Sequence, residues 1–231
     1  MDGAFAQAFL LIVSLDPDFL GIVGLSLRVT LTAVLISAVI GLPLGALLAV
    51  TRFPGRGLIV VSVNALMGLP PVVAGLLVYL ALSRSGPLGF LGFLFTPSAM
   101  IVAQTILVLP IVIALTRQVV DELWTEYGDH LTSVGQTGAG AIGTLLFDGR
   151  VALAVALLAG FGRASAEVGA VIIVGGNIAG HTRTMTTAIA LETSKGDLAL
   201  ALGLGIVLLA ITLTINVAAF GASRLWRHDA G

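Results

Sequence analysis

Arg163 and Glu167 are the residues best placed to do chemistry, because they are charged side chains inside an apolar segment. Their spacing of i and i+4 puts them on one face of a helix, where they can form an ion pair. If a membrane span begins at Val151, a rise of about 1.5 Å per residue places Arg163 about 18 Å along it, near the bilayer centre. A charge at that depth costs at least about 2.5 kcal/mol. The pair is therefore either a salt bridge that orients the helix or a gate that lines a polar path.

The polar segment 176–197 follows this span and carries groups that suit an oxyanion. Hydroxyl groups and a fixed cation hold an oxyanion by hydrogen bonds rather than by full neutralisation. An ordinary solvated loop would have a similar composition. If the segment does contact a small anion, the residues that we expect on its path are Thr182, Arg183, Thr184 and Thr186.

A second pattern in this region partly matches the sequence motif of a nucleotide-binding loop. Residues 175–182 read GGNIAGHT, close to the phosphate-binding G-x-x-x-x-G-K-[ST] loop. His181 replaces the lysine, however, and the preceding segment has the composition of a membrane helix rather than of a buried strand. We therefore expect this chain to bind no cofactor, and any ATP that drives it to be bound by another chain.

Catalytic and metal-binding constellations are not expected. The chain has no cysteine, and its three histidines, His130, His181 and His228, fall outside the apolar spans. An intramembrane enzyme would need a catalytic pair or a metal cluster at one depth. The sequence thus predicts a protein that catalyses no bond chemistry itself.

The composition predicts an integral membrane protein. Of the 231 residues, 58% are hydrophobic and 10% charged, and the mean hydropathy is +1.11, whereas about 25% of the residues in a soluble domain are charged. The net charge of −1 offers no basic excess for nucleic acid. Five segments reach the length of about 20 apolar residues that a spanning helix needs. They are approximately 26–50, 58–82, 97–116, 151–175 and 198–221.

The segments outside these spans complete an expected division of the chain. Residues 1–23 form an N-terminal interfacial segment, because the apolar run 5–15 is short and is followed by Asp16, Pro17 and Asp18. The core is expected over 24–223, and 224–231 is a cytoplasmic tail. Lysines and arginines near the span ends are more numerous on the side of the loop 117–150. That bias predicts an outside N-terminus and an inside C-terminus.

Glycine and proline interrupt two of the predicted spans. Gly41 and Gly45 form a small-xxx-small pair that permits close approach of another helix. The second span contains Gly68, Pro70, Pro71 and Gly75. Broken helices occur at membrane depth where the backbone is buried in protein or lines a cavity, so this span could face a pathway.

The loop 117–150 is where a partner ATPase would attach. Its composition fits a helix around 123–134, a glycine-rich break at 135–143 and a second short helix. An amphipathic hairpin without a partner would fit the same pattern. The loop resembles the coupling segment of binding-protein-dependent ABC importer permeases, whose pattern is E-A-A, three residues and Gly. In that alignment Asp129 takes the Glu position, His130 and Leu131 replace the alanines, and Gly135 takes the Gly position.

The stretch GRASAEVGAVIIVGGNIAGHTRTM, residues 162–185, is similar to the F-A-R-A-L-G-E-F-G-A and G-N-I-P-G-K-T-Q-T-M motifs of molybdate permeases. GLPPVVAGLLVYLALSRSGPLG at 68–89 and HTRTMTTAIALETSKGD at 181–197 resemble tungstate permeases more closely. The likeness extends from about residue 24 to 223.

The resemblance implies an all-α, MetI-like (type I) ABC importer permease core. It implies a homodimer in the cell membrane, in contact with lipid, two copies of a cytoplasmic ABC ATPase and an external tungstate-binding protein. It places Arg163, Glu167 and Gly169 at a gate. It also places coupling to the ATPase at Glu126, Asp129, His130, Leu131 and Gly135.

The sequence therefore predicts the membrane subunit of an ATP-driven importer for tungstate. The same machine carrying molybdate or sulfate is the nearest alternative. A channel or secondary transporter is more remote, because it would not need the inward coupling segment.

Overall fold

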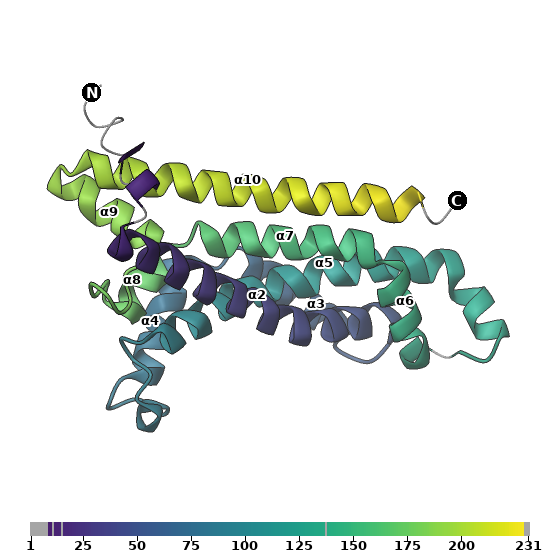
Figure 1. Ribbon diagram of the computed structural model, residues 1–231. Helices are drawn as coiled ribbons and strands as arrows, with labels where there is room; N and C mark the ends of the chain where they lie inside the picture. Colours follow the sequence, from purple (N-terminus) through teal and green to yellow (C-terminus); the bar gives the residue numbers. More distant parts are fainter. Residues whose placement is uncertain (1–8, 11, 15, 137, 229–231) are drawn as a thin grey trace.

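The computed structural model describes residues 9, 10, 12–14, 16–136 and 138–228, without the side chains of 219, 220 and 222–228. The described part is all-helical and contains no strand, which confirms the predicted all-α class. Three helices are long and apolar enough to cross a membrane, and two bent helix pairs raise the number to five if each pair is one span. Most of the long helices lie side by side, with the N-terminal segment at one end and the C-terminus at the other (Figure 1).

The first long helix, α2 (Pro17–Val50), begins at an N-cap formed by Asp16. The Asp16 carboxylate accepts hydrogen bonds from the N–H groups of Asp18 and Phe19, each at 3.0 Å, and Pro17 supplies a preset φ at the first position. Two turns that we had assigned to the interfacial segment therefore belong to α2. The rest of that predicted segment lies partly outside the described residues.

The helix α5 (Pro97–Ser133) packs along α2 at very short range. A Cβ atom added at Gly45 would lie 2.6 Å from the carbonyl oxygen of Ile113, and one added at Gly41 would lie 2.8 Å from Cγ1 of Val112. The predicted close approach at this glycine pair is confirmed. Any larger side chain at Gly45 would force the two backbones apart.

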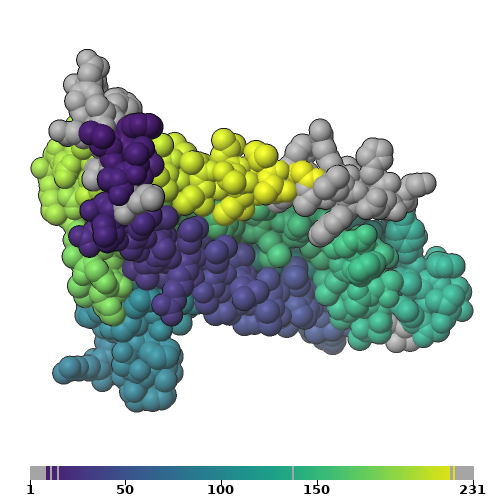
Figure 2. Space-filling model, in the orientation of Figure 1, coloured from purple at the N-terminus to yellow at the C-terminus, as the bar shows by residue number. Residues whose placement is uncertain are grey.

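The second predicted span is broken, as its glycines and prolines indicated. Helix α3 (Arg56–Met67) and helix α4 (Pro71–Leu82) meet at an angle of 104°. The segment 83–96, which contains the short 3₁₀ helix η1 (Gly89–Leu91), follows α4 and projects from the body of the molecule (Figure 2). It leads into the N-terminus of α5.

The helix of the third predicted span continues beyond the predicted end of that span. Helix α5 does not end near Thr116 but continues to Ser133. The residues after Thr116 are more polar, but apolar side chains such as Val120 and Leu123 recur on the packed face of the helix. The 3₁₀ helix η2 (Gly138–Ala141) and helix α6 (Ile142–Asp148) then complete the segment 117–150, which is predicted to be cytoplasmic and is called the cytoplasmic segment below. The expected helix, break and second short helix are confirmed.

The fourth predicted span is divided. Helix α7 (Arg150–Ser165) ends before Glu167, and the short helix α8 (Gly169–Gly175) continues after the break. Part of the polar segment, expected as a loop, forms helix α9 (Met185–Lys195). Helix α10 (Leu198–His228) runs beside α7 and extends through most of the expected tail.

Two apolar clusters lie at opposite ends of this bundle, and α5 belongs to both. The cluster that we call outer, and its counterpart that we call inner, are named after the predicted orientation of the chain. The outer cluster joins α2, α4, α5 and α8, and its buried members include Val29, Val78, Met100 and Val171. The inner cluster joins α2, α5, η2 and α6; its buried residues are Ala46, Ala49, Val50, Val120, Ala141 and Leu145. A helix of 37 residues, about 55 Å long, therefore links the two ends.

The contact between α4 and α8 gives a test of this packing. A Cβ atom at Gly75 would lie 2.7 Å from Cα of Ala170, so Gly75→Val must separate the two helices. Overpacking of this kind costs about 1–3 kcal/mol. We expect a lower temperature of half-aggregation for the purified protein. Gly24→Val is the control, because a Cβ at Gly24 meets no other atom within 4 Å, and equal loss in both variants would contradict the packing.

Candidate functional site: the broken fourth span and the cytoplasmic segment

The break between α7 and α8 is organised around the Glu167 carboxylate. One oxygen, Oε2, pairs with Nη1 of Arg163 at 2.8 Å, and the other, Oε1, accepts a hydrogen bond from the Ala170 N–H at 2.9 Å. The side chain of Glu167 is only 2% exposed, whereas that of Arg163 is 29% exposed. Glu167 thus joins the end of one helix to the start of the next.

This geometry differs from the continuous helix on which the pair was predicted. The i,i+4 ion pair is present, but it bridges a break, because α7 already ends at Ser165. The backbone N–H groups directly after Ser165 remain hydrogen-bonded to the last turn of α7. The Glu167 N–H donates to the Ala164 carbonyl oxygen at 3.1 Å, and the Ala166 N–H donates to that of Gly162 at 3.2 Å.

Two side chains from elsewhere in the chain satisfy the carbonyl groups at the break. The amide of Gln104 on α5 donates to the Ala164 carbonyl oxygen at 3.1 Å, and the hydroxyl of Thr186 on α9 donates to that of Glu167 at 2.8 Å. Gln104 is buried. A polar group inside an apolar span costs free energy unless it is paired, so these contacts fix where α5 and α9 lie relative to the break.

Gly169 begins α8 at a crowded position. An added Cβ atom would lie 3.0 Å from Cγ2 of Val72 on α4 and 3.6 Å from Oε1 of Glu167. Together with the Gly75 contact, this puts the outer halves of both broken spans against each other. The three residues predicted at the gate, Arg163, Glu167 and Gly169, are therefore brought together.

The four residues expected on an oxyanion path divide into two kinds. The three hydroxyl groups are engaged inside the chain: Thr182 donates to the Gly175 carbonyl oxygen at 2.6 Å, Thr184 contacts the Thr187 hydroxyl at 3.1 Å, and Thr186 holds the break. Thr182 and Thr184 are also buried. Thr184 and Thr186 line a small cavity beside the break, whereas Arg183 lines a larger cavity with residues of α2.

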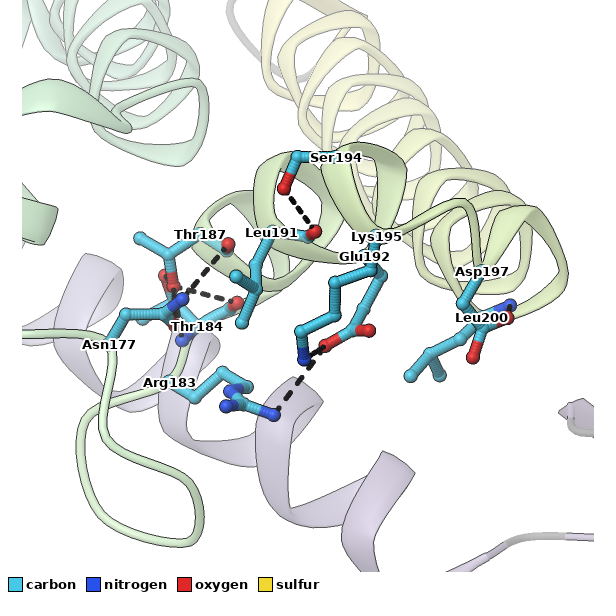
Figure 3. A network of polar contacts seen from close by, with 10 residues as sticks. All are labelled: Asn177, Arg183, Thr184, Thr187, Leu191, Glu192, Ser194, Lys195, Asp197 and Leu200. Carbon is cyan, nitrogen blue, oxygen red and sulfur yellow. Dashed lines mark hydrogen bonds and ion pairs between the residues drawn. The ribbon is translucent and has the colours of Figure 1, made fainter.

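Arg183 belongs to a charged group around α9, drawn in Figure 3. The buried carboxylate of Glu192 contacts Lys195 Nζ at 3.1 Å and Arg183 Nη1 at 3.7 Å, both through Oε1. The same view shows Asn177 beside Thr184 and Thr187, with its Oδ1 2.9 Å from the Thr187 hydroxyl. At the start of α9, the Met185 N–H donates to the Ser26 hydroxyl on α2 at 2.7 Å, which ties this region to the first long helix.

The predicted coupling residues lie at the inner end of α5 and in the turn that follows it. The side chains of Glu126, Asp129 and His130 are exposed, while Leu131 packs against the inner cluster. Gly135 has φ +85°, a left-handed conformation that favours glycine, and its N–H donates to the Thr132 carbonyl oxygen at 3.0 Å. The segment therefore exposes charged and polar side chains on one side and packs apolar side chains against the inner cluster on the other.

One further titratable group lies in this segment. Glu126, by a side-chain hydrogen bond and by its negative charge, raises the pKa of Tyr127 above its usual value. Tyr127 therefore stays a neutral phenol at physiological pH. It adds a hydrogen-bonding group, but no charge, to the exposed surface.

Sequence reasoning missed a charged clamp that holds the inner end of α5 to α2 and α3. Arg56 Nε donates to the Leu48 carbonyl oxygen at 2.6 Å, and its Nη2 lies 3.6 Å from Asp121 Oδ1. Arg117 lies 3.9 Å from the other Asp121 oxygen. Gln104 was also missed, although a lone amide among apolar residues was a signal for it. Nothing in the local spacing pointed to Arg56, which needed the folded positions of α2 and α5.

The comparisons agree with the class of protein that this fold defines, a polytopic membrane permease. No family model matches the chain. It is 41% identical to the tungstate uptake system permease protein TupB of Peptoclostridium acidaminophilum over 197 residues, 84% of this chain and 85% of that protein. It is also 41% identical to a probable anion ABC transporter permease protein of Haloferax volcanii, over 77% of this chain and 78% of that protein.

A more distant relative is the sulfate transport system permease protein CysW of Escherichia coli K12, at 28% identity over 76% of this chain and 63% of that protein. The chain belongs to the family of ABC-transporter permease proteins that includes the TupB proteins. It is accordingly a multi-pass protein of the cell membrane.

Substitutions at Glu167 can test whether its negative charge matters apart from its shape and hydrogen-bonding capacity. Glu167→Gln retains an oxygen that can accept from the Ala170 N–H but removes the charge that pairs with Arg163. We expect the ATPase–permease complex to assemble while its basal ATP hydrolysis changes severalfold. Size-exclusion chromatography and a phosphate-release assay measure the two effects. Glu167→Asp keeps the charge and serves as the comparison; normal hydrolysis and uptake in Glu167→Gln would remove the pair from the mechanism.

Gly135 supplies a second prediction. Gly135→Val places a β-branched residue at φ +85°, which strains the turn by at least about 1–2 kcal/mol. We expect more ATP to be hydrolysed per substrate ion transported, because the turn no longer holds the end of α5. The control is Gly143→Val, in a helix where an added Cβ meets no atom within 4 Å. The same ATP-to-substrate ratio in wild type and Gly135→Val would show that this turn has no part in coupling.

Proposed function

We propose that this chain is the membrane-spanning subunit of an ATP-driven importer for tungstate. The substrate rests on the 41% identity to a tungstate uptake permease over most of both chains. Import of molybdate or sulfate by the same machinery is the alternative, and the lower identity to a sulfate permease favours it less. In this proposal the chain moves the ion and forms or breaks no covalent bond.

The single observation that carries the mechanism is the continuous helix α5. Its inner end holds Glu126, Asp129 and His130, and its outer half holds Gln104, which contacts the broken span at Ala164. A force applied at the inner end therefore reaches the break without passing through a flexible connection. Rigid-body tilting of such a helix is a recognised way to open one side of a pathway while closing the other.

The proposed assembly is a homodimer of this chain with two copies of a cytoplasmic ABC ATPase and one external tungstate-binding protein. The ATPase would bind Mg-ATP and contact the exposed surface at 126–135. We assign the choice between tungstate and molybdate mainly to the binding protein. Two tetrahedral dianions so close in size are told apart by an organised, dry cage of donors, which a transient path does not need.

The assembled transporter gives the direct test of this function. Proteoliposomes with the permease, its ATPase and its binding protein should take up tungstate only with ATP on the ATPase side. Excess molybdate and sulfate should inhibit this uptake little. Equal uptake of molybdate would contradict the substrate, and uptake without ATP would contradict the importer in favour of a channel or secondary transporter. An ATPase variant that cannot hydrolyse ATP is the control.

A further inference from the structure

The outer end of the bundle contains a cavity of about 600 Å³ that the mechanism above does not use. Its walls come from the start of α2, the first residue of α5 and the turn before α9. Its charged and titratable residues are Asp18, Arg28, His181 and Arg183. Three of these four, Arg28, His181 and Arg183, are basic side chains, and they come from two segments more than 150 residues apart in the sequence. Such a gathering suits an anion better than a cation.

Arg28 is the cationic side chain of this cavity whose N–H groups are all available to a ligand. Its side chain is exposed and makes no hydrogen bond or ion pair with another described residue, Asp18 included. A guanidinium near the end of an apolar helix can extend to the membrane interface, where an anion from the aqueous phase can reach it. Its five N–H groups can bind two oxygens of a tetrahedral anion side by side.

Arg183 also has capacity left, although it contacts Glu192. Lys195 lies nearer to the shared Glu192 oxygen, at 3.1 Å against 3.7 Å for Arg183 (Figure 3). The negative charge of Glu192 is therefore already paired with the positive charge of Lys195. The Nε atom of Arg183 is buried and has no hydrogen-bond partner among the described residues, so an ion in the cavity would be bound by the Nη atoms of this side chain. The side chain of His181 is exposed and likewise makes no contact of this kind with them.

A helix end adds to the positive potential of the cavity. Pro97, the first residue of the 37-residue helix α5, lines it. The side chain of the preceding Thr96 makes no capping hydrogen bond to this helix, and its hydroxyl donates to the Phe93 carbonyl oxygen at 2.6 Å. Pro97 has no N–H group to donate, so the contribution of this helix end is its dipole, which favours an anion nearby.

We propose that this cavity is an entry site for a tetrahedral oxyanion, held between Arg28, His181 and Arg183. The proposal rests on the function proposed above, since the oxyanion would be the transported ion on its way from the binding protein to the break. Asp18 opposes the anion and keeps the site weak. An entry site must release its ion, so a carboxylate at its edge fits that use.

Binding can be measured on the permease–ATPase complex in phosphatidylcholine nanodiscs without the binding protein. Equilibrium dialysis against tungstate, with tungsten determined by elemental analysis, gives the dissociation constant. We expect saturable binding of one ion per permease chain. Arg28→Gln should weaken it on the order of tenfold, the loss expected for a hydrogen bond to a charged group. Asp18→Asn should tighten it.

Arg84→Gln is the matched control, because Arg84 is exposed, lies on the projecting segment and does not line the cavity. Absence of saturable binding to the wild-type complex would overturn the site. So would a dissociation constant unchanged in both Arg28→Gln and Asp18→Asn. If Arg28→Gln fails to assemble, tighter binding in Asp18→Asn still supports the site and unchanged binding refutes it.

A phospholipid headgroup offers the same phosphate-like chemistry from a different source. Native mass spectrometry in detergent distinguishes the two, because a lipid site would retain a phospholipid that Arg28→Gln releases, with no competition by tungstate. That outcome would overturn the entry site. Failure here is separable from failure of the transport proposal: ATP-driven tungstate uptake with no saturable binding refutes only the cavity, whereas binding without any uptake refutes only the importer.

Discussion

The structure depends on satisfying backbone polar groups where a helix is broken inside an apolar bundle. An unpaired carbonyl or N–H group in that environment costs several kcal/mol, so a break needs partners supplied by other segments. At 165–169 those partners are the carboxylate of Glu167, the amide of Gln104 and the hydroxyl of Thr186. They come from the break itself, from α5 and from α9. The same contacts that make the break possible therefore connect it to the rest of the chain.

This requirement explains why α5 is central to the function. One helix belongs to the apolar clusters at both ends, holds the break through Gln104 and carries the exposed residues of the cytoplasmic segment. Gly41 and Gly45 let it lie directly against α2, and Asp121 pairs with Arg56 near the inner end. Close packing and paired charges resist independent movement of α5. Coupling between a cytoplasmic ATPase and the broken span would then travel through a rigid element.

Much of this fold was predictable from the sequence, because apolar length and glycine or proline signals act locally. The all-α class, the break at Gly68–Pro71 and the close approach at Gly41 follow from such signals. The end of α7 at Ser165 did not, because the contacts at the break include one from Gln104, which is remote in the sequence. For the candidate site, the Arg163–Glu167 contact was predictable from its spacing. The internal use of the Thr182, Thr184 and Thr186 hydroxyls was not, because composition does not tell a bound hydroxyl from a free one.

The rigidity of α5 is the central claim, and spin-label distances test it most directly. The chain has no cysteine, so labels can be placed at the exposed positions Ile106 and Thr125 without removing native thiols. We expect the distance between them to stay the same in nucleotide-free and ATP-trapped complexes, while the distance between the two Thr125 labels of the proposed homodimer changes by several ångströms. A changed 106–125 distance with a constant 125–125 distance would show that α5 bends, for which Pro110 offers a place, and would contradict the account.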